Sequence, residues 1–426
     1  MFKKFLSIIF ICVIYLNMGV GILYAEEEIL SWNDCVREAA KNHPDLIAAE
    51  EVVKQNQANT HIVSSAIYPQ VNSSLTAATS RSDSGNGASV GDAYNYGLSA
   101  SQLIFDGAKT LNNINAAGET LNASKQGYRF ASTTVRYNLR SAFINLLNAQ
   151  ENLNITRQIF EIRRSNLELI TLRYESGLEH KGALLTAEAD LAQANYSMAQ
   201  AQRNVGVAQG QLTQQLGRLK LVPMRVLGDF QVRETAENKP VFETLIKNNP
   251  SLLQLDAQKK SAAFALKSAY ANFSPTLTGS AGANNNGAKW TPKSNQWNMG
   301  LSVSMPIFEG GLRFAQVDQA RGVLNQLIAN EKSTRDNLIY ALEQSWAALQ
   351  DAVDNVGVQK LNLTATEERS KIAQAQYSIG FISFDNWTII ENNLVTAKQK
   401  FLAAQAAALS AEAAWIKAKG ETLEYE

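Results

Sequence analysis

The sequence predicts a mainly α-helical chain that carries two pairs of β-strands and is built as two copies of one unit. Three observations support this fold class. The 426-residue chain repeats its motifs at an offset of 203 residues, which pairs Phe105 with Phe308 and Gly217 with Gly420 without a gap. Each copy holds a proline-free run of about 70 residues. Each copy also holds segments in which apolar and polar side chains alternate.

The first 25 residues are typical of a secretory signal peptide. Lys3 and Lys4 precede an apolar run over residues 5–20, and Leu-Tyr-Ala ends at Ala25, ahead of three glutamates. We expect cleavage after Ala25; an uncleaved membrane anchor is the alternative. The exported chain then keeps one cysteine, Cys35, and forms no internal disulfide.

The duplication sets the expected domain boundaries. Residues 26–217 form the first copy and residues 244–420 the second. Residues 218–243 are expected to form an equatorial linker between the copies, and residues 421–426 a C-terminal tail.

Each copy is predicted to contain one shorter helix and a hairpin of two long ones. Pro44 and Pro250 open the shorter helices, because proline is favoured in a first turn. Apolar residues recur every three to four positions along the proline-free runs, as in a heptad seam. At ~1.5 Å per residue such a run reaches on the order of 105 Å. The predicted helices are 44–66, 107–176 and 184–216 in the first copy, and 250–272, 310–379 and 389–419 in the second.

The predicted strands lie within residues 70–104 and 276–307. Their side chains alternate with period two, which is the signature of a strand with two different faces. We expect residues 81–92, "RSDSGNGASVGD", to form the loop of the first pair. The charged residues of both segments fall in the loops, and aromatic residues stand near the strand ends. This pattern favours strands inside a membrane; a soluble sandwich with one polar face is the alternative.

A membrane location for these strands requires partners. No stretch after residue 25 approaches the ~20 apolar residues of a membrane helix, so any membrane entry would use the strands. Four strands leave two bare edges, which lipid does not tolerate. Three chains would supply twelve strands and close a barrel whose interior holds water.

The composition argues against several other classes of function. Lys and Arg number 39, as do Asp and Glu, so a basic surface for nucleic acid is not expected. His43, His61 and His180 are isolated along the chain, and the strands carry no paired carboxylates. We therefore predict that the protein is not an enzyme and uses no metal or cofactor.

Taken in order, the motifs resemble those of the TolC-like outer-membrane efflux protein family. The matching motifs are "YPQV" and "FSPTL" at strand starts, "LIFDGA" and "PIFEGG" at strand ends, and a Tyr-x-x-Gly turn in each copy. The resemblance implies a homotrimer with a twelve-stranded β-barrel continued by an α-helical tunnel through the periplasm. It implies an outer-membrane exit duct of a tripartite efflux or type I secretion system in a Gram-negative bacterium. Such a duct works with a periplasmic adaptor (membrane fusion protein) and an inner-membrane pump of the RND, ABC or MFS type.

The resemblance places the two Tyr-x-x-Gly turns at the periplasmic tip, where the adaptor binds and the tunnel narrows. The expected tip residues are Arg173, Tyr174, Gly177, Tyr377 and Gly380.

The expected pore constriction lies just after the second turn, at Phe384, Asp385, Asn386 and Trp387. The family's acidic pair falls here at Asn386 and Ile389, so a charge-locked gate is in doubt. Closure by apolar contact of Phe384 and Trp387 is the alternative hypothesis.

Another class of function shares the export signal and the long helices. A periplasmic coiled-coil scaffold or adaptor without a pore would have both features. It would not need charge-poor strands, which therefore favour the duct. The cargo is not encoded in any motif of the sequence.

Overall fold

The computed structural model describes residues 28–84, 87–232 and 239–423, and the predicted signal peptide and its cleavage site at Ala25 lie outside them. The chain divides into two compact units. The first unit comprises Met1–Glu38, Ala142–Phe230 and Ala365–Ala403, and the second comprises Ala39–Ser141, Gln231–Thr364 and Ala404–Glu426. No helix among the described residues has the length and apolar character needed to cross a bilayer.

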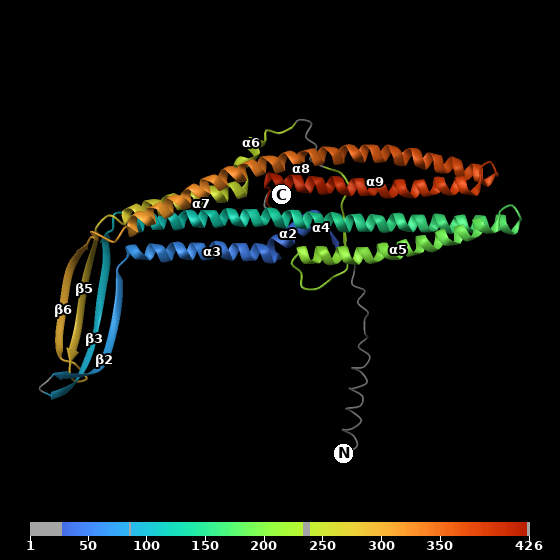
Figure 1. Ribbon diagram of the computed structural model, residues 1–426. Helices are drawn as coiled ribbons and strands as arrows, with labels where there is room; N and C mark the ends of the chain where they lie inside the picture. Colours follow the sequence, from blue (N-terminus) through green and yellow to red (C-terminus); the bar gives the residue numbers. More distant parts are fainter. Residues whose placement is uncertain (1–27, 85–86, 233–238, 424–426) are drawn as a thin grey trace, which may run out of the picture. The chain divides into compact units, whose positions relative to one another are not determined.

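The second unit contains one antiparallel sheet of four strands (Figure 1). The strands are β2 (Gln70–Ser84), β3 (Gly87–Phe105), β5 (Thr276–Gly287) and β6 (Ser294–Ser304), and they lie in the order β2-β3-β5-β6. The hairpins of the two copies thus pair with each other through β3 and β5. Strands β2 and β6 are the two edges of the sheet.

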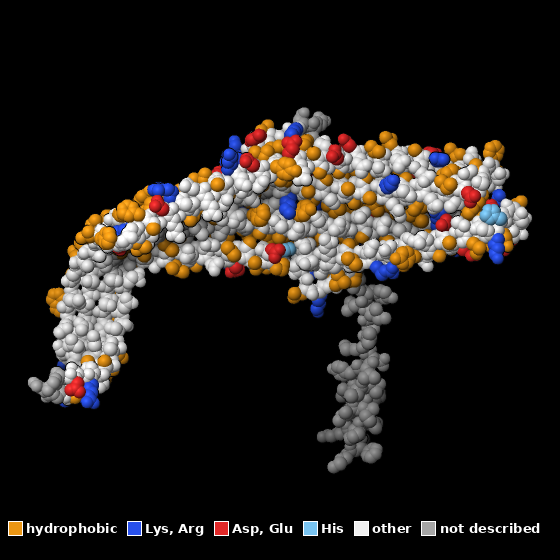
Figure 2. Space-filling model, viewed as in Figure 1, with side chains coloured by type: hydrophobic (Ala, Val, Ile, Leu, Met, Phe, Trp, Pro, Cys, Tyr) orange, Lys and Arg blue, Asp and Glu red, His pale blue; other side chains and the backbone are white. Residues whose placement is uncertain are grey.

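The strand register separates an apolar face from a polar one. Leu98 lies beside Ala283, which lies beside Trp297, whereas the neighbouring row holds Gly97, Asn284 and Gln296. The face of the sheet that carries Leu98 holds further apolar rows. The opposite face carries only uncharged residues in the described strands, mostly Asn, Ser, Thr and Gly. Figure 2 shows charged side chains gathered at the end of this sheet, with the sheet face in view otherwise free of them.

The first hairpin is longer than the sequence suggested. Residues 81–92 were expected to form a loop, yet β2 and β3 continue through most of them, with Arg81 opposite Val90 and Asp83 opposite Ala88. Proline, which would break the ladder, is absent from this segment, and Thr79 donates a hydrogen bond to Asp92 across the strands at 2.8 Å. The charges of this hairpin therefore lie on strands rather than in a loop.

Two helices of 67 residues each, α4 (Lys109–Glu175) and α8 (Leu312–Ser378), follow the strand pairs. They occupy nearly the same ranges as the predicted long helices, and each spans about 100 Å at 1.5 Å per residue. Asp106 caps the start of α4, where its carboxylate accepts a hydrogen bond from the Thr110 amide at 2.8 Å. The fold class predicted from the sequence, mainly helical with long helices and strands, is confirmed.

The shorter helices α3 (Pro44–Ser64) and α7 (Pro250–Ala271) begin at the predicted prolines. The residue before each proline caps the helix through its side chain. His43 Nδ1 accepts from the Asp45 amide at 3.2 Å, and Asn249 Oδ1 accepts from the Ser251 amide at 3.0 Å. His43 therefore has a structural role at the start of α3.

The return helices α5 (Lys181–Gln215) and α9 (Phe384–Lys419) start earlier than predicted, by three and five residues. For α9 the cause is Ser383, whose hydroxyl accepts a hydrogen bond from the Asn386 amide at 3.3 Å. Asp385 in the first turn adds a favourable interaction with the helix dipole. The segment that interrupts the helices is therefore shorter than the sequence suggested.

The helices of the second unit enclose an aromatic core. Trp346 and Trp415 lie with their ring centroids 5.2 Å apart, next to Phe242 of the short helix α6 (Phe242–Leu245). The short 3-10 turn η2 (Ile246–Asn248) follows α6, and η1 (Ser65–Ile67) ends α3. Lys259 of α7 pairs with Glu331 of α8 at 2.5 Å, which ties these two helices together.

Several elements lie where the sequence predicted none. Strand β1 (Glu28–Leu30) pairs in parallel with β4 (Met224–Val226) of the predicted linker, and α2 (Trp32–Asn42) follows β1. The three-residue strands give too little alternation to be recognised in a sequence, whereas Trp32, Cys35, Val36 and Ala39 of α2 have a helical spacing that could have revealed this helix.

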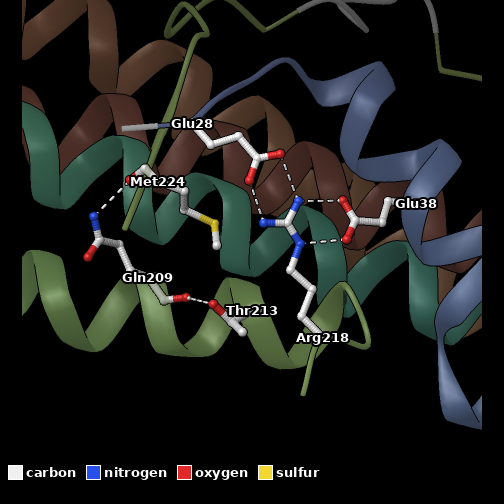
Figure 3. A network of polar contacts seen from close by, with 6 residues as sticks. All are labelled: Glu28, Glu38, Gln209, Thr213, Arg218 and Met224. Atoms are coloured by element: carbon white, nitrogen blue, oxygen red, sulfur yellow. Dashed lines mark hydrogen bonds and ion pairs between the residues drawn. The ribbon is translucent and has the colours of Figure 1, made fainter. Parts of the chain in front are cut away.

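An arginine holds these elements to the end of α5 (Figure 3). Arg218 donates to both oxygens of Glu28 at 2.6 and 3.0 Å and to both oxygens of Glu38 at 2.5 and 2.7 Å. Nearby, Gln209 donates to the Met224 carbonyl at 2.8 Å. These contacts attach the start of the described chain to the first unit.

Candidate functional site

The candidate site is the end of the two helical hairpins in the first unit. Both hairpins turn with the same backbone device. Gly177 has φ +72° and Gly380 has φ +78°, in the left-handed region that closes a helix. The Leu178 amide donates to the Arg173 carbonyl, and the Phe381 amide donates to the Gln376 carbonyl, both at 2.8 Å. The Tyr-x-x-Gly motif predicted these turns because glycine adopts this conformation without strain.

An apolar cluster fills the space between the four helix ends. We name it the tip cluster; its buried members are Ile170, Ala183, Ala187, Ala373, Tyr377, Phe384 and Trp387. The Tyr377 and Trp387 rings stack with centroids 4.5 Å apart and planes 7° from parallel. Phe384 meets Trp387 edge to face at 6.4 Å. Stacked and edge-to-face pairs of this kind add about 0.5 to 1.5 kcal/mol each beyond area burial.

Residues of the first copy hold Tyr377, which belongs to the second. The Arg173 guanidinium carbon lies 4.7 Å from the centre of the Tyr377 ring. Arg173 also donates to the Tyr377 carbonyl at 3.4 Å, and the Tyr377 hydroxyl donates to Glu179 at 2.8 Å. Burial and the bond to Glu179 raise the pKa of the Tyr377 phenol well above its usual value. The phenol therefore stays protonated and keeps its role as donor.

The expected tip residues thus divide into three groups. Arg173 and Tyr377 contact each other, and Gly177 and Gly380 shape the two turns. Tyr174 is exposed at the surface of the hairpin end.

The four residues expected at the constriction are placed differently from one another. Phe384 is 8% exposed and Trp387 is 2% exposed, because both pack into the tip cluster. Asp385 and Asn386 are exposed. In this conformation Phe384 and Trp387 pack within the subunit, and closure of a pore by these two residues stays a hypothesis.

A polar layer lies directly behind the tip cluster. It surrounds a small cavity between α4, α5 and α9, lined by Arg163, Asn166, Ile170, Ala187, Asp190, Phe384, Trp387, Thr388 and Glu391. Arg163 pairs with Asp190 at 3.5 Å and donates to Asn392. The buried Glu391 accepts from Ser370. The indole N–H of Trp387 is buried without a hydrogen-bond partner among the described residues.

Sequence reasoning missed Glu179 and Arg163. Glu179 lies two residues after Gly177, just outside the Tyr-x-x-Gly motif, and its partner Tyr377 is about 200 residues away in the sequence. Arg163 is a charged residue on the buried side of a long helix. A cation among apolar heptad positions is the signal that could have revealed it.

The described residues contain no group of three or more His, Cys, Asp or Glu that could hold a metal ion. The contacts at the hairpin ends have a structural role. They join two helical hairpins at their ends through one tyrosine, one arginine and one glutamate.

The chain is similar to proteins of known family in sequence and in fold. The family model described as "Outer membrane efflux protein" matches residues 35–218 and 241–421. The outer membrane efflux protein BepC of Brucella suis is 23% identical over 391 residues, which is 88% of this chain and 83% of that protein. The cation efflux system protein CusC of Escherichia coli is 21% identical over 394 residues, covering 91% of this chain and 85% of that protein. Among solved structures, the Campylobacter jejuni CmeC outer membrane channel superposes with a TM-score of 0.81 at 20% identity, over 91% of this chain and 85% of that chain.

Proposed function

The chain belongs to the outer membrane efflux protein family, and from this premise we propose that three copies of it form a passive channel that serves as the exit duct of a tripartite efflux or type I secretion system. As an outer-membrane efflux protein it resides in the outer membrane of a Gram-negative bacterium. Its proposed partners are two further copies of itself, a periplasmic adaptor, an inner-membrane pump and the lipid of the outer membrane.

The observation that carries the proposal is a sheet with two faces and two bare edges. One face is apolar and suits lipid, whereas the other carries uncharged amides, hydroxyls and glycines and suits water. Among the strands that the structure describes, β2 and β6 each leave a row of backbone donors and acceptors without a partner strand. Each such group left unsatisfied in lipid costs several kcal/mol. Three sheets joined edge to edge give twelve strands, and this closure satisfies all edges.

The long helices supply the rest of the duct. Helices of about 100 Å exceed the thickness of the hydrocarbon core of a bilayer by a factor of about three. In the proposed assembly they continue the barrel as a tunnel into the periplasm, and the hairpin ends meet the adaptor. Tyr174, Gly177 and Gly380 are exposed there, while Arg173 and the buried Tyr377 hold the two hairpins together beneath that surface. The pump is of the RND, ABC or MFS type.

We propose that the tip cluster positions the constriction rather than lining it. Asp385 and Asn386 are exposed on the first turn of α9, while Phe384 and Trp387 hold that turn from within. The duct catalyses no reaction in this proposal. The uncharged polar face of the sheet offers no code for one cargo, so selection is assigned to the pump.

Two measurements on the mature protein in detergent test the proposal. Light scattering with size-exclusion chromatography should give the mass of a trimer, and insertion into a planar bilayer should give discrete conductance steps. A monomer that stays in solution without detergent and conducts nothing would overturn it, and would favour a scaffold instead.

A further inference from the structure

The apolar face of the sheet changes in character toward the β5–β6 turn, at the end remote from the helices. One row across the sheet holds Leu98, Ala283 and Trp297. The next row toward the turn holds Tyr96, Asn285 and Asn295. The turn itself carries Lys289 and Lys293. Along the strands toward this turn, the side chains of the face therefore change from apolar to aromatic and amide, and then to the two lysines.

The β5–β6 turn packs back onto this aromatic row. Trp290 lies 6.0 Å from Tyr94 and 6.4 Å from Tyr96 between ring centroids, both nearly edge to face. Asn285 donates to the Tyr96 hydroxyl at 2.7 Å. Pro292 is buried in the turn, close enough to Gly287 that a Cβ built there would lie 3.1 Å from the Pro292 Cβ. These contacts fix the turn in position.

The two lysines of the turn carry positive charge, and their own hairpin has no acid to offset it. Both side chains are exposed, and residues 276–304 contain no Asp or Glu. Trp290 between them is 61% exposed, although it makes two aromatic contacts. An exposed indole flanked by cations, just beyond an apolar band, is the composition of a surface at a membrane interface.

We propose that Lys289, Trp290 and Lys293 bind the phosphate groups of the glycolipid in the outer leaflet of the outer membrane. The proposal rests on the proposed function, because it needs the apolar face of the sheet to lie in lipid. The helices then lie on the periplasmic side and the turn at the outer surface. Each lysine forms a charge-assisted hydrogen bond with a phosphate, while Trp290 and the tyrosines lie at the level of the sugar headgroup.

The first hairpin provides an internal contrast. It carries Arg81 together with Asp83 and Asp92, and these acids outnumber the cation. Asp92 is also engaged by Thr79. The phosphate site is therefore assigned to the second hairpin alone.

The test measures binding of diphosphorylated lipid A, and of the same lipid with its phosphates removed, to the full mature protein in detergent by native mass spectrometry. The double variant K289Q/K293Q should bind the phosphorylated lipid roughly 30-fold more weakly at low salt, because each lysine near an anionic surface contributes on the order of fivefold. The variant K289R/K293R, which keeps both charges, should bind like the wild type. The dephosphorylated lipid should bind the wild type and K289Q/K293Q equally weakly.

Two controls complete the experiment. The variant K332Q/K360Q removes two exposed lysines from α8, and R81Q removes the cation of the first hairpin; neither should change binding. Equal binding of phosphorylated lipid by wild type and K289Q/K293Q, or equal binding of both lipids by the wild type, would overturn the inference. If the protein still forms a conducting trimer, either of these results leaves the proposed function intact. A wild-type protein that forms no trimer and shows no conductance would instead refute the proposed function itself.

Discussion

Replacing Arg218 with glutamine should loosen the N-terminal strand of the protein. The arginine is 17% exposed and makes four hydrogen bonds with Glu28 and Glu38. Glu28 is 41% exposed, so its pair is screened by water and contributes about 0.5 kcal/mol. Glu38 is 22% exposed, and its bidentate pair contributes about 1.5 kcal/mol. The loss is therefore about 2 kcal/mol, or roughly a 30-fold change in the local opening equilibrium.

Hydrogen exchange measures this opening directly. The Leu227 amide donates to the Leu30 carbonyl at 3.0 Å, so amides around residues 28–30 and 224–227 report on the β1–β4 pair. In R218Q their protection should fall roughly 30-fold at pH 7. R218K keeps the charge but not the planar fork, and should fall in between.

The pH dependence of this effect has a definite sign. The hydrogen bond from Arg218 holds the pKa of Glu28 below its usual value. The Glu28 contribution is therefore present above the pKa of an unfolded glutamate, about 4.3, and is lost as the pH falls through the lower folded pKa. The difference between wild type and R218Q should shrink in acid. Unchanged protection at pH 7, or a loss that is the same at neutral and acid pH, would refute the reasoning.

Three further outcomes are expected. Y377F removes the hydroxyl that donates to Glu179 but keeps the stacked ring, so it should destabilise the hairpin ends by about 1.5 to 3 kcal/mol. The channel conductance of Y377F should rise; an unchanged conductance would show that this hydrogen bond does not help to close the channel. Cys35 is fully buried, and burial raises the pKa of its thiol to about 12. At pH 8 the thiol should therefore react with a disulfide reagent at least about 1,000-fold more slowly in the folded than in the unfolded protein. Fast labelling of Cys35 in the folded protein would contradict its burial. G380A forces a side chain into a backbone with φ +78° and should destabilise that turn by about 1 kcal/mol in exchange measurements, without a steric clash, because no atom lies within 4 Å of the added Cβ.

The parts of the fold that the sequence predicted are those with long periodicity or a repeated motif. The two 67-residue helices follow from proline-free heptad-like runs, and the sheet faces follow from strict alternation around Leu98 and Trp297. The duplicated Tyr-x-x-Gly motif predicted the left-handed glycines Gly177 and Gly380. Each of these signals is local, so it can be recognised without knowing the neighbours of a residue.

The contacts of the candidate site were harder to predict because they join distant segments. Arg173 and Tyr377 were both expected at the tip, but neither motif indicates that one lies over the other. Trp387 was predicted to lie at the pore constriction, and within the subunit its ring is buried in a stacked contact with Tyr377. An apolar residue on a helix has the same pattern whether it packs inside its own subunit or faces a lumen.

The parallel pairing of β1 with β4 has a consequence for how the protein is made. Glu28 lies opposite Met224, so the two strands are separated by 196 positions along the chain. During export from the N-terminus, residues 28–30 emerge first and then wait for about half of the polypeptide. At a synthesis rate of about 5–20 residues per second, making the residues between the two strands alone takes roughly 10 to 40 seconds. The leading end thus lacks its partner strand and stays accessible to periplasmic chaperones and proteases throughout that interval, and residues 365–403 of the first unit follow later still.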